Sequence, residues 1–478
     1  MNETSTQTRV RSDVADRAAR GSSTIAILTR GWGPGLIRGG LAFAVMVALG
    51  QAVAFAVNLA QGGGVSAGST AKLGWLYFGW FHHADVTTHL TSTVDGVRRG
   101  SALSGGSGLT ADVGLAMMLG TFLAVAILYR GGRAVADGVG GGAAARILHG
   151  MKVAPAYAIA AFVVSGVVDI DITVPRNALV SGSLQTRPWD LSWFVLPLLV
   201  AVAAGGAGGL RSARHELLSI DPWGRRAAGA VAGGLRMFVL GLVLSFVGLV
   251  VLAVVRPSAS RTYFETVSGP PTAQTAVIAA HHVLLLPNQS MWVLVPAMGG
   301  CDGLHGENVS ASFLCYSNFP STTSVTPEGL RSGTAVVRAE FETAPSGYLL
   351  FLLVPAVSVV LGGRYAARKR ARLKWEAVGV GAASGVLFAI LIAVGSWFAS
   401  VSAGLTWPAA DIRSVSVQIG PGLWAAGLLA LAWGVVGGAL GGWLGGRTFP
   451  PRAWRPEHSS LLARRAAGVP PPGAGRRG

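Results

Sequence analysis

The chain has 478 residues, of which 51% are hydrophobic and 12% are charged, and its mean hydropathy is +0.52. Soluble domains carry about twice that share of charged residues, so this composition excludes an ordinary soluble domain. The net charge of +17 would favour nucleic-acid binding in a soluble protein. Here the basic residues lie in short loops and tails beside apolar runs, so we assign them to membrane topology and expect no nucleic-acid partner.

The N-terminal segment, residues 1–30, is polar and lacks the basic, apolar and small-residue order of a cleavable signal peptide. We expect it to be a disordered cytoplasmic tail. Beyond this tail the chain contains long apolar runs. One of them, 237–255, holds 19 residues without a charge, enough to cross roughly 30 Å of hydrocarbon as a helix. Nine apolar runs follow in chain order, near 37–61, 111–129, 153–172, 191–210, 236–255, 273–298, 347–363, 375–400 and 421–445.

Charge decides how many of these runs cross the membrane. The N-terminal tail carries six Arg up to Arg38, the loop at 364–374 carries six basic residues in eleven, and the C-terminal tail carries seven Arg from Arg447 onward. Loops rich in Lys and Arg stay in the cytoplasm. Both tails should therefore be cytoplasmic, which nine spans would not allow.

The sixth run, 273–298, resolves the conflict because Pro287, Asn288, Gln289 and Ser290 interrupt it. Proline breaks the helical hydrogen-bond ladder, and the polar residues cannot face lipid. We interpret the run as a re-entrant hairpin that enters and leaves on the outer face. Eight spans then remain, and 28 of the 38 Lys and Arg residues lie on the cytoplasmic side.

The two cysteines, Cys301 and Cys315, lie in the segment 298–346, which this topology places outside the cell. An oxidising compartment favours a disulfide that closes a small loop, and the alternative is two free thiols. A zinc site would need further ligands at suitable spacing, which the segment lacks. We therefore favour the disulfide.

Several landmarks recur in the same order, which indicates an internal duplication. They are Trp32-Gly33 and Trp223-Gly224, Gly39-Gly40 and Gly233-Gly234, His82-His83 and His281-His282, and Gly131-Gly132 and Gly362-Gly363. We predict an all-α polytopic membrane protein with two parallel four-span repeats, 31–210 and 211–446, related by a pseudo-two-fold axis along the membrane normal. Each repeat has a membrane-dipping segment, 73–83 in the first. The Pro- and Arg-rich segment 447–478 should be a second disordered cytoplasmic tail.

Histidines are the first candidates for chemistry. His and carboxylate side chains near the outer face could hold a transition metal, and packing of the repeats about an axis would bring the two His-His pairs together. The alternative is that these histidines cap helices or bond loop carbonyls. We favour that alternative and expect neither a metal nor another cofactor. The residues concerned are His82, His83, Asp85 and His89, with His281, His282 and His305.

The hairpin tip, Pro287 to Ser290, is the second candidate, because broken membrane helices expose backbone groups that bind ions or substrates. The alternative is a structural plug. Charge inside the spans is nearly absent, which argues against a proton-coupled antiporter. Asp112, Asp169 and Asp171 lie at outer ends of spans, and Gln51 and Asn58 are the main polar residues of the first span.

Two common enzyme signatures are missing from the sequence. It contains no GxxxxGK[ST] loop and no HExxH, so we expect no ATP-driven step and no catalytic residue of these types.

Two stretches resemble a known family. Lys72-Leu-Gly-Trp-Leu-Tyr-Phe78 with Phe81-His82-His83, and the stretch from Leu284 to Cys301, resemble the actinobacterial streptophobe membrane proteins, a family without an established activity. The portion Leu-Leu-Pro-Asn-x-x-x-Trp within 285–292 is similar, more distantly, to the PerM type of membrane protein linked to cell division. The resemblance implies an actinobacterial host, a multi-pass architecture and the plasma membrane, and it transfers no catalytic residue.

These observations predict a multi-pass plasma-membrane protein with a non-catalytic role in the envelope, the cell wall or cell division. It would act through other membrane or envelope proteins besides the lipid bilayer. The alternative is a transporter or channel-like protein for a small solute or a lipid, which the duplication and the broken hairpin favour.

Overall fold

The computed structural model describes fourteen segments of the chain, and all structural statements concern them. They are residues 29–60, 66–93, 107–168, 170–174, 181–187, 190–214, 222–255, 281–306, 310–315, 318–325, 337–343, 346–368, 373–407 and 412–446. The two predicted tails, apart from residues 29 and 30, and the first limb of the predicted hairpin, 273–280, lie outside the described residues.

Within these segments, eight helical stretches are long and apolar enough to cross a membrane, the number expected from the sequence. A turn at Lys152 and Val153 divides one of them into two helices, α5 and α6. The others are single helices. They are α2 (Trp32–Ala60), α4 (Met118–Val139), α5 (Ala143–Met151) with α6 (Ala154–Val167), α7 (Ser192–Ser212), α9 (Pro222–Val255), α14 (Leu353–Arg368, preceded by a 3-10 turn, Ser346–Leu352), α15 (Lys374–Ala399) and α16 (Leu423–Gly446).

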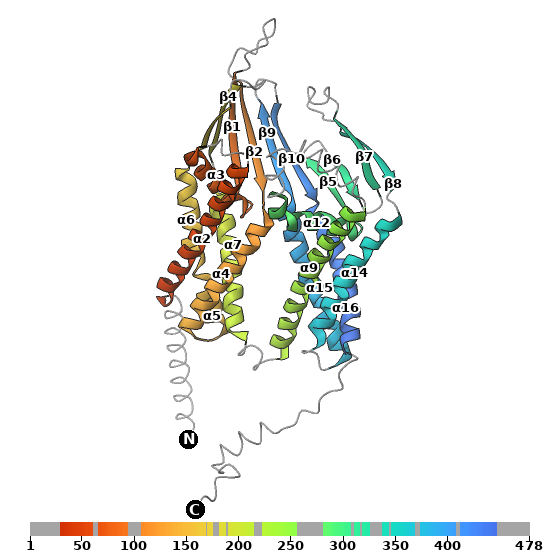
Figure 1. The fold of residues 1–478 in the computed structure, drawn as a ribbon. Coiled ribbons are helices and arrows are strands. Elements are labelled where there is room, and N and C mark those ends of the chain that lie inside the picture. The colour runs from red at the N-terminus through yellow and green to blue at the C-terminus, as the bar shows by residue number, and fades with distance from the viewer. Residues whose placement is uncertain are drawn as a thin grey trace, which may run out of the picture.

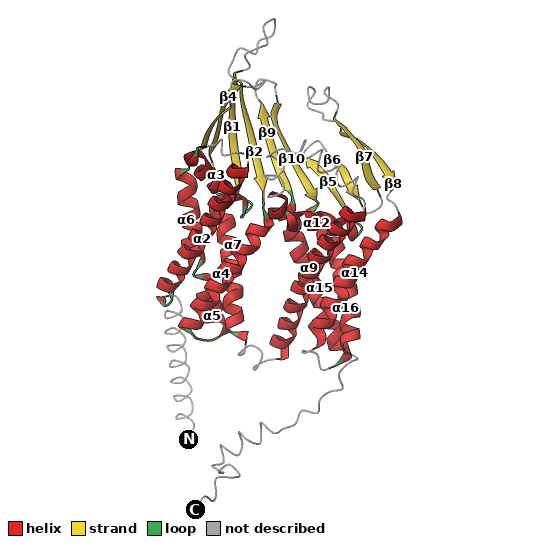
Figure 2. Ribbon diagram, viewed as in Figure 1, coloured by secondary structure: helices red, strands yellow, loops and turns green. Residues whose placement is uncertain are grey.

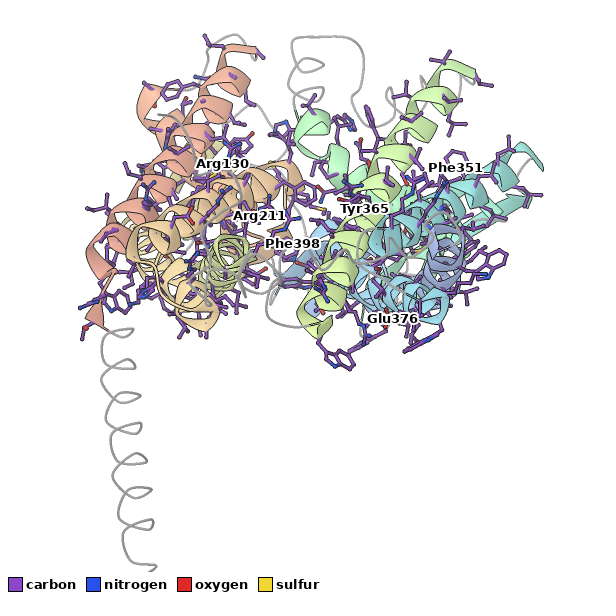
Figure 3. All side chains as sticks on the ribbon, turned by 90° about the horizontal axis from the view of Figure 1, so that it is seen from below. Arg130, Arg211, Phe351, Tyr365, Glu376 and Phe398 are labelled. Carbon is purple, nitrogen blue, oxygen red and sulfur yellow. A yellow bond between two sulfur atoms is a disulfide. The ribbon has the colours of Figure 1, made fainter. Side chains whose placement is uncertain are left out.

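These helices form two bundles, α2 to α7 and α9 to α16, which lie side by side (Figure 1). The first bundle has its own core around Phe78, Tyr157 and Trp193, and the second has a core around Met237 and Phe388. Figure 3 shows the pair of bundles from the end opposite the sheet described below. The outward helix faces expose many large apolar side chains, as expected for surfaces that meet lipid.

Glycines let the helices of each bundle pack with their backbones in contact. A side chain on Gly208 of α7 would overlap the backbone oxygen of Tyr129 on α4. In the second bundle, a side chain on Gly441 of α16 would overlap the backbone oxygen of Val360 on α14. Membrane helices gain no hydrophobic driving force from one another in lipid, so such close backbone contact is how they associate.

The prediction of an all-α protein omitted a large β-sheet. Eight strands form one antiparallel sheet in the order β3-β4-β1-β2-β9-β10-β5-β6, at one end of the two bundles (Figure 2). Two further strands, β7 and β8, form a separate hairpin. The strands are β1 (Asp85–Thr93), β2 (Ser107–Leu115), β3 (Ile170–Val174), β4 (Ser181–Arg187), β5 (Cys301–Gly306), β6 (Ser310–Cys315), β7 (Asn318–Val325), β8 (Val337–Thr343), β9 (Val401–Trp407) and β10 (Ile412–Pro421).

The sheet joins parts of the chain that are far apart in sequence. β2 pairs with β9 through six residue pairs, from Thr110 with Thr406 to Leu115 with Val401. The segment 298–346, expected as an outer loop, contributes β5 to β8. Asp112 and Asp171, expected at the ends of spans, lie in β2 and β3, and Asp169 lies outside the described residues.

The described chain begins and ends on the side opposite the sheet (Figure 1). Every hairpin of the large sheet lies between the sheet-side ends of helices, so the other helix ends share the opposite side. Basic residues gather at those ends, among them Arg130, Arg133, Arg211, Arg364, Arg368 and Lys374.

Besides the two parts of the divided span, the described residues contain two helices too short to cross, α3 (Ala67–Trp80) and α12 (Leu286–Ala297). α3 runs back along α2: the Gln51 amide donates to the backbone oxygen of Ala71, and the Asn58 amide donates to the Thr70 hydroxyl, both at 2.9 Å. The two polar residues of the first span therefore hold α3 in place.

The break in the sixth run lies at a different position from the one predicted. Pro287 lies in the first turn of α12, where its missing N–H removes no helical hydrogen bond, and the turn in the chain is at Leu285. Asn288, Gln289 and Ser290 are therefore helical residues and do not form a hairpin tip.

Candidate functional site

The two bundles meet beneath the sheet, where α3 and the start of α4 face α12 and the end of α15. We call this region the junction and define it by Tyr77, His83, Met118, Asn288 and Phe398. Each of these residues contacts the opposite bundle through an interaction described below. The junction therefore includes His83 of the first histidine pair and Asn288 of the predicted hairpin tip, and Tyr77 contacts His281 of the second pair there.

Asn288 is the central polar residue of the junction, and its side chain is only 4% exposed. Its amide nitrogen donates to the backbone oxygens of Ala116 at 2.7 Å and Phe398 at 3.3 Å. Its amide oxygen accepts from the backbone N–H of Met118 at 3.1 Å. The first N–H groups of a helix have no partner within the helix, and no side chain next to Met118 caps α4. Asn288 therefore caps α4 from the other bundle and holds the end of α15 beside it.

The neighbours of Asn288 are also engaged within the protein. The Gln289 amide donates to Nδ1 of His282, and the Ser290 hydroxyl donates to the backbone oxygen of Leu286 at 2.9 Å. Pro287 has no N–H to offer. The arrangement of these four residues fits a packed structural element better than a lining that binds a solute.

His82 has both ring nitrogens in hydrogen bonds. Nδ1 lies 2.8 Å from the backbone oxygen of Phe78, and Nε2 lies 2.6 Å from the hydroxyl of Tyr157. A carbonyl oxygen only accepts, so Nδ1 carries the hydrogen and Nε2 accepts from Tyr157. No lone pair is then left for a metal ion, and the alternative expected from the sequence, a histidine that bonds a carbonyl, describes His82.

His83 has an unusual backbone conformation, with φ of 58° in the left-handed region. It follows α3 in the position where helices usually place glycine, and the backbone N–H of Ala84 closes the cap on Gly79 at 3.1 Å. Gly299, with φ of 94°, occupies the same position after α12, where Gly300 closes on Val295. A residue other than glycine costs about 1–2 kcal/mol in this conformation.

The ring of His83 is buried against the second bundle. Its centroid lies 4.7 Å from the ring of Trp397 and 5.6 Å from that of Phe398. Its Nδ1 has no hydrogen-bond partner among the described residues. Burial lowers the pKa of His83 to about 4, so the ring is neutral at physiological pH.

The second histidine pair contacts the first bundle at the junction through Tyr77. The hydroxyl of Tyr77, on α3, lies 2.7 Å from Nε2 of His281. The pairs are not equivalent landmarks, however, because His82 and His83 follow α3, whereas His281 and His282 precede α12. Among the described residues, no group of three or more His, Cys, Asp or Glu side chains could hold a metal ion. Asp85 and His89 lie in β1 and His305 lies in β5.

A disulfide joins Cys301 to Cys315 across the paired strands β5 and β6. The next residue, Asp302, is fully buried, and neither carboxyl oxygen has a hydrogen-bond partner in the described part of the chain. Burial raises the pKa of Asp302 to about 8. Sequence reasoning missed this residue, because an acid in an apparent loop carries no signal of burial.

Tyr157, Trp397 and Phe398 were also missed as partners of the histidines. Each lies in an apolar run, where an aromatic residue is expected in any case, so no pattern marks it. The comparisons with family models, with curated proteins and with solved structures gave no match for this chain.

Proposed function

We propose that this chain is a non-catalytic plasma-membrane protein that presents its sheet on the outer side of the membrane to other envelope proteins of cell-wall synthesis or division. The observation that carries the proposal is the hydrogen bonding of Asn288. Asn288 was the best candidate to line a solute path, but its hydrogen bonds hold α4 beside α15. The sheet above this point continues across both bundles.

The orientation follows from charge and redox chemistry. Basic residues gather at the helix ends opposite the sheet, and such ends stay in the cytoplasm. The Cys301–Cys315 disulfide lies on the sheet side, and disulfides persist in oxidising compartments. Both termini are then cytoplasmic and the sheet is extracytoplasmic.

A parallel repeat organises the two bundles in this proposal. Both halves have the same order: a long helix, a short helix, a hairpin, two spans, a second hairpin and a last span, with β7 and β8 added in the second half. The glycine contacts recur as well: Gly132, Gly205 and Gly208 of the first bundle have counterparts in Gly363, Gly438 and Gly441 of the second. The contact of Gly208 with Tyr129 matches that of Gly441 with Val360, and that of Gly209 with Arg146 matches that of Gly442 with Ala377.

The repeat does not fit the expected two-fold axis. A two-fold axis pairs equivalent surfaces with each other. In the element order, β2 of the first half corresponds to β6, and β9 of the second half corresponds to β3. The ladder between β2 and β9 therefore joins unlike strands, and the halves follow one another head to tail.

The two short helices, α3 and α12, contain the residues that resemble the streptophobe family, and they are the proposed membrane-dipping segments. The stretches that resemble the streptophobe family form α3 and α12 with the residues directly after them. α3 folds back along α2, which supports a membrane-dipping segment in the first half. The likeness supports an actinobacterial plasma membrane as the location, and the more distant PerM likeness supports a role near cell division.

A transporter for a small solute or a lipid is the second candidate. The observation that favours it is that each hydrophobic core is drawn almost entirely from one bundle, with Met118 of α4 as the buried exception, since bundles with largely separate cores can move against each other.

Labelling with a membrane-impermeant maleimide tests the proposal. Single cysteines replace Ala67 and Ala144, which are exposed at opposite ends of the first bundle, and Ser290, which is buried in the junction. The native cysteines stay paired and do not react. In intact cells only Ala67→Cys should react, and Ala144→Cys should react once the cells are opened.

Reaction of Ser290→Cys in intact cells would mean a water path into the junction. That result would overturn the scaffold proposal in favour of the transporter. Reaction of Ala144→Cys in intact cells would overturn the orientation, since residue 144 lies at the end opposite the sheet.

A further inference from the structure

In the head-to-tail arrangement, each half of the chain pairs one edge of its strands with the other half and leaves its second edge without a strand partner among the described residues. Within the chain, an edge of the first half, β2, pairs with an edge of the second half, β9. The corresponding edge of the second half is β6, and the corresponding edge of the first half is β3. Within the described residues, β6 pairs only with β5, and β3 pairs only with β4.

Such outer strands present backbone N–H and C=O groups that pair readily with another strand. β6 and β3 are the two edge strands of the eight-stranded sheet. Because β6 corresponds to β2 and β3 corresponds to β9, β6 should be able to pair with β3 of another copy as β2 pairs with β9. The hairpin of β7 and β8 follows β6 in the chain and lies beside it (Figure 1), but it forms a separate sheet and adds no ladder pair to β6.

We propose that the protein assembles head to tail with further copies of itself, with β6 of one copy paired to β3 of the next. This inference rests on the repeat described under the proposed function. A contact between unlike surfaces does not close at two copies, so the assembly is a row or a ring in the membrane.

A second copy fits this edge better than a soluble partner, because the membrane fixes the geometry. Both halves begin on the side opposite the sheet and place their hairpins on the sheet side. The displacement that superposes the first half on the second therefore leaves the orientation of each half in the bilayer unchanged. A further displacement of the same kind sets the next copy in the same membrane, with its sheet on the same side.

Cross-linking between chains that carry different tags tests the assembly. One chain carries Thr173→Cys in β3, and the other carries Ser312→Cys in β6, with the native disulfide kept in both. A short bismaleimide is applied to membranes from cells that make both chains, or either one alone. We expect a product that contains both tags in the mixture and no dimer in either chain alone.

The matched control is Thr88→Cys in β1, a strand with partners on both sides. It should give no product with either chain. A single chain with both Thr173→Cys and Ser312→Cys should give a ladder of products longer than two chains, because each copy then offers both edges.

Two results would overturn the inference. One is a dimer of each variant with itself, which shows a two-fold contact. The other is the absence of any product while both cysteines react with a simple maleimide. Either result leaves the labelling of Ala67, Ala144 and Ser290 unchanged, so failure of the assembly is distinguishable from failure of the scaffold proposal.

Discussion

Tyr157 donates its hydroxyl hydrogen to Nε2 of His82 across 2.6 Å. Tyr157 lies on α6, and His82 lies two residues beyond the end of α3, so this bond ties the short helix to a span. Both side chains are fully buried.

Replacement of Tyr157 by Phe should destabilise the protein, because Nε2 of His82 then stays buried without its donor. A buried polar atom without a partner costs about 1–3 kcal/mol. Thermal unfolding of the purified protein in detergent measures the loss. Tyr129→Phe, in α4, is the matched control, since the structure shows no hydrogen bond of that hydroxyl in the described chain. Equal shifts for the two variants would contradict the role of the bond.

Asn288→Asp should be among the more damaging single changes at the junction. The carboxylate still accepts from Met118, but it cannot donate to Ala116 and Phe398 and places negative charge beside their carbonyl oxygens. We expect a loss of about 3 kcal/mol or more, since removal of a buried partner costs more where a charge is introduced. The same unfolding measurement applies. Ser290→Ala, which removes only a bond within α12, should cost about 1 kcal/mol or less.

The glycine contacts predict matching effects in the two bundles. Gly208→Ala and Gly441→Ala each force a methyl group into a backbone oxygen of the neighbouring helix. Overpacking of this kind costs about 1–3 kcal/mol, so both variants should unfold at lower temperature by similar amounts. Gly379→Ala, in α15, is the control: a methyl group there meets no atom within 4 Å. It should be neutral or stabilising, since alanine favours helices by up to about 1 kcal/mol over glycine.

The buried carboxyl of Asp302 predicts a dependence of stability on pH. Burial raises its pKa from 3.8 to about 8 in the folded protein, so the folded state holds a proton that the unfolded state has lost. Stability therefore falls as pH rises from about 4 to about 8 and is level above that range.

The Asp302→Asn variant carries an amide that is uncharged at every pH, so its stability relative to the wild type should rise between pH 5 and pH 8 and then level off. Unfolding temperatures of both proteins, with the disulfide intact, measure this difference. Other groups that titrate in this range are common to the two proteins and cancel. A difference that does not change with pH would show that Asp302 is ionised in the folded state.

The spans were predictable from sequence because each is a local property. A run of some 20 apolar residues can satisfy its backbone in lipid only as a helix, and the eight long helices match eight of the nine apolar runs. The sheet was not predictable in the same way. The ladder between 110–115 and 401–406 joins segments nearly 300 residues apart, and no local pattern specifies such a partner.

The residues of the candidate site were found, but their interpretation changed. Asn288 and the histidine pairs stood out because polar side chains are rare beside apolar runs. Their partners are backbone groups of Ala116 and Phe398 and the hydroxyls of Tyr77 and Tyr157, which only the packing of distant helices supplies. Sequence can therefore show that a polar group needs a partner without showing which one it has.

The strand order also constrains how the protein is made. β9 and β10 are synthesised after all the other strands, yet they lie between β2 and β5 in the finished sheet. In the orientation proposed above, the centre of the sheet forms only once α15 spans the bilayer and β9 and β10 lie outside. Until then the edges of β2 and β5 lack the strands that pair with them in the finished sheet, so a ribosome that stops before residue 401 leaves a chain without the strands that join β2 to β5.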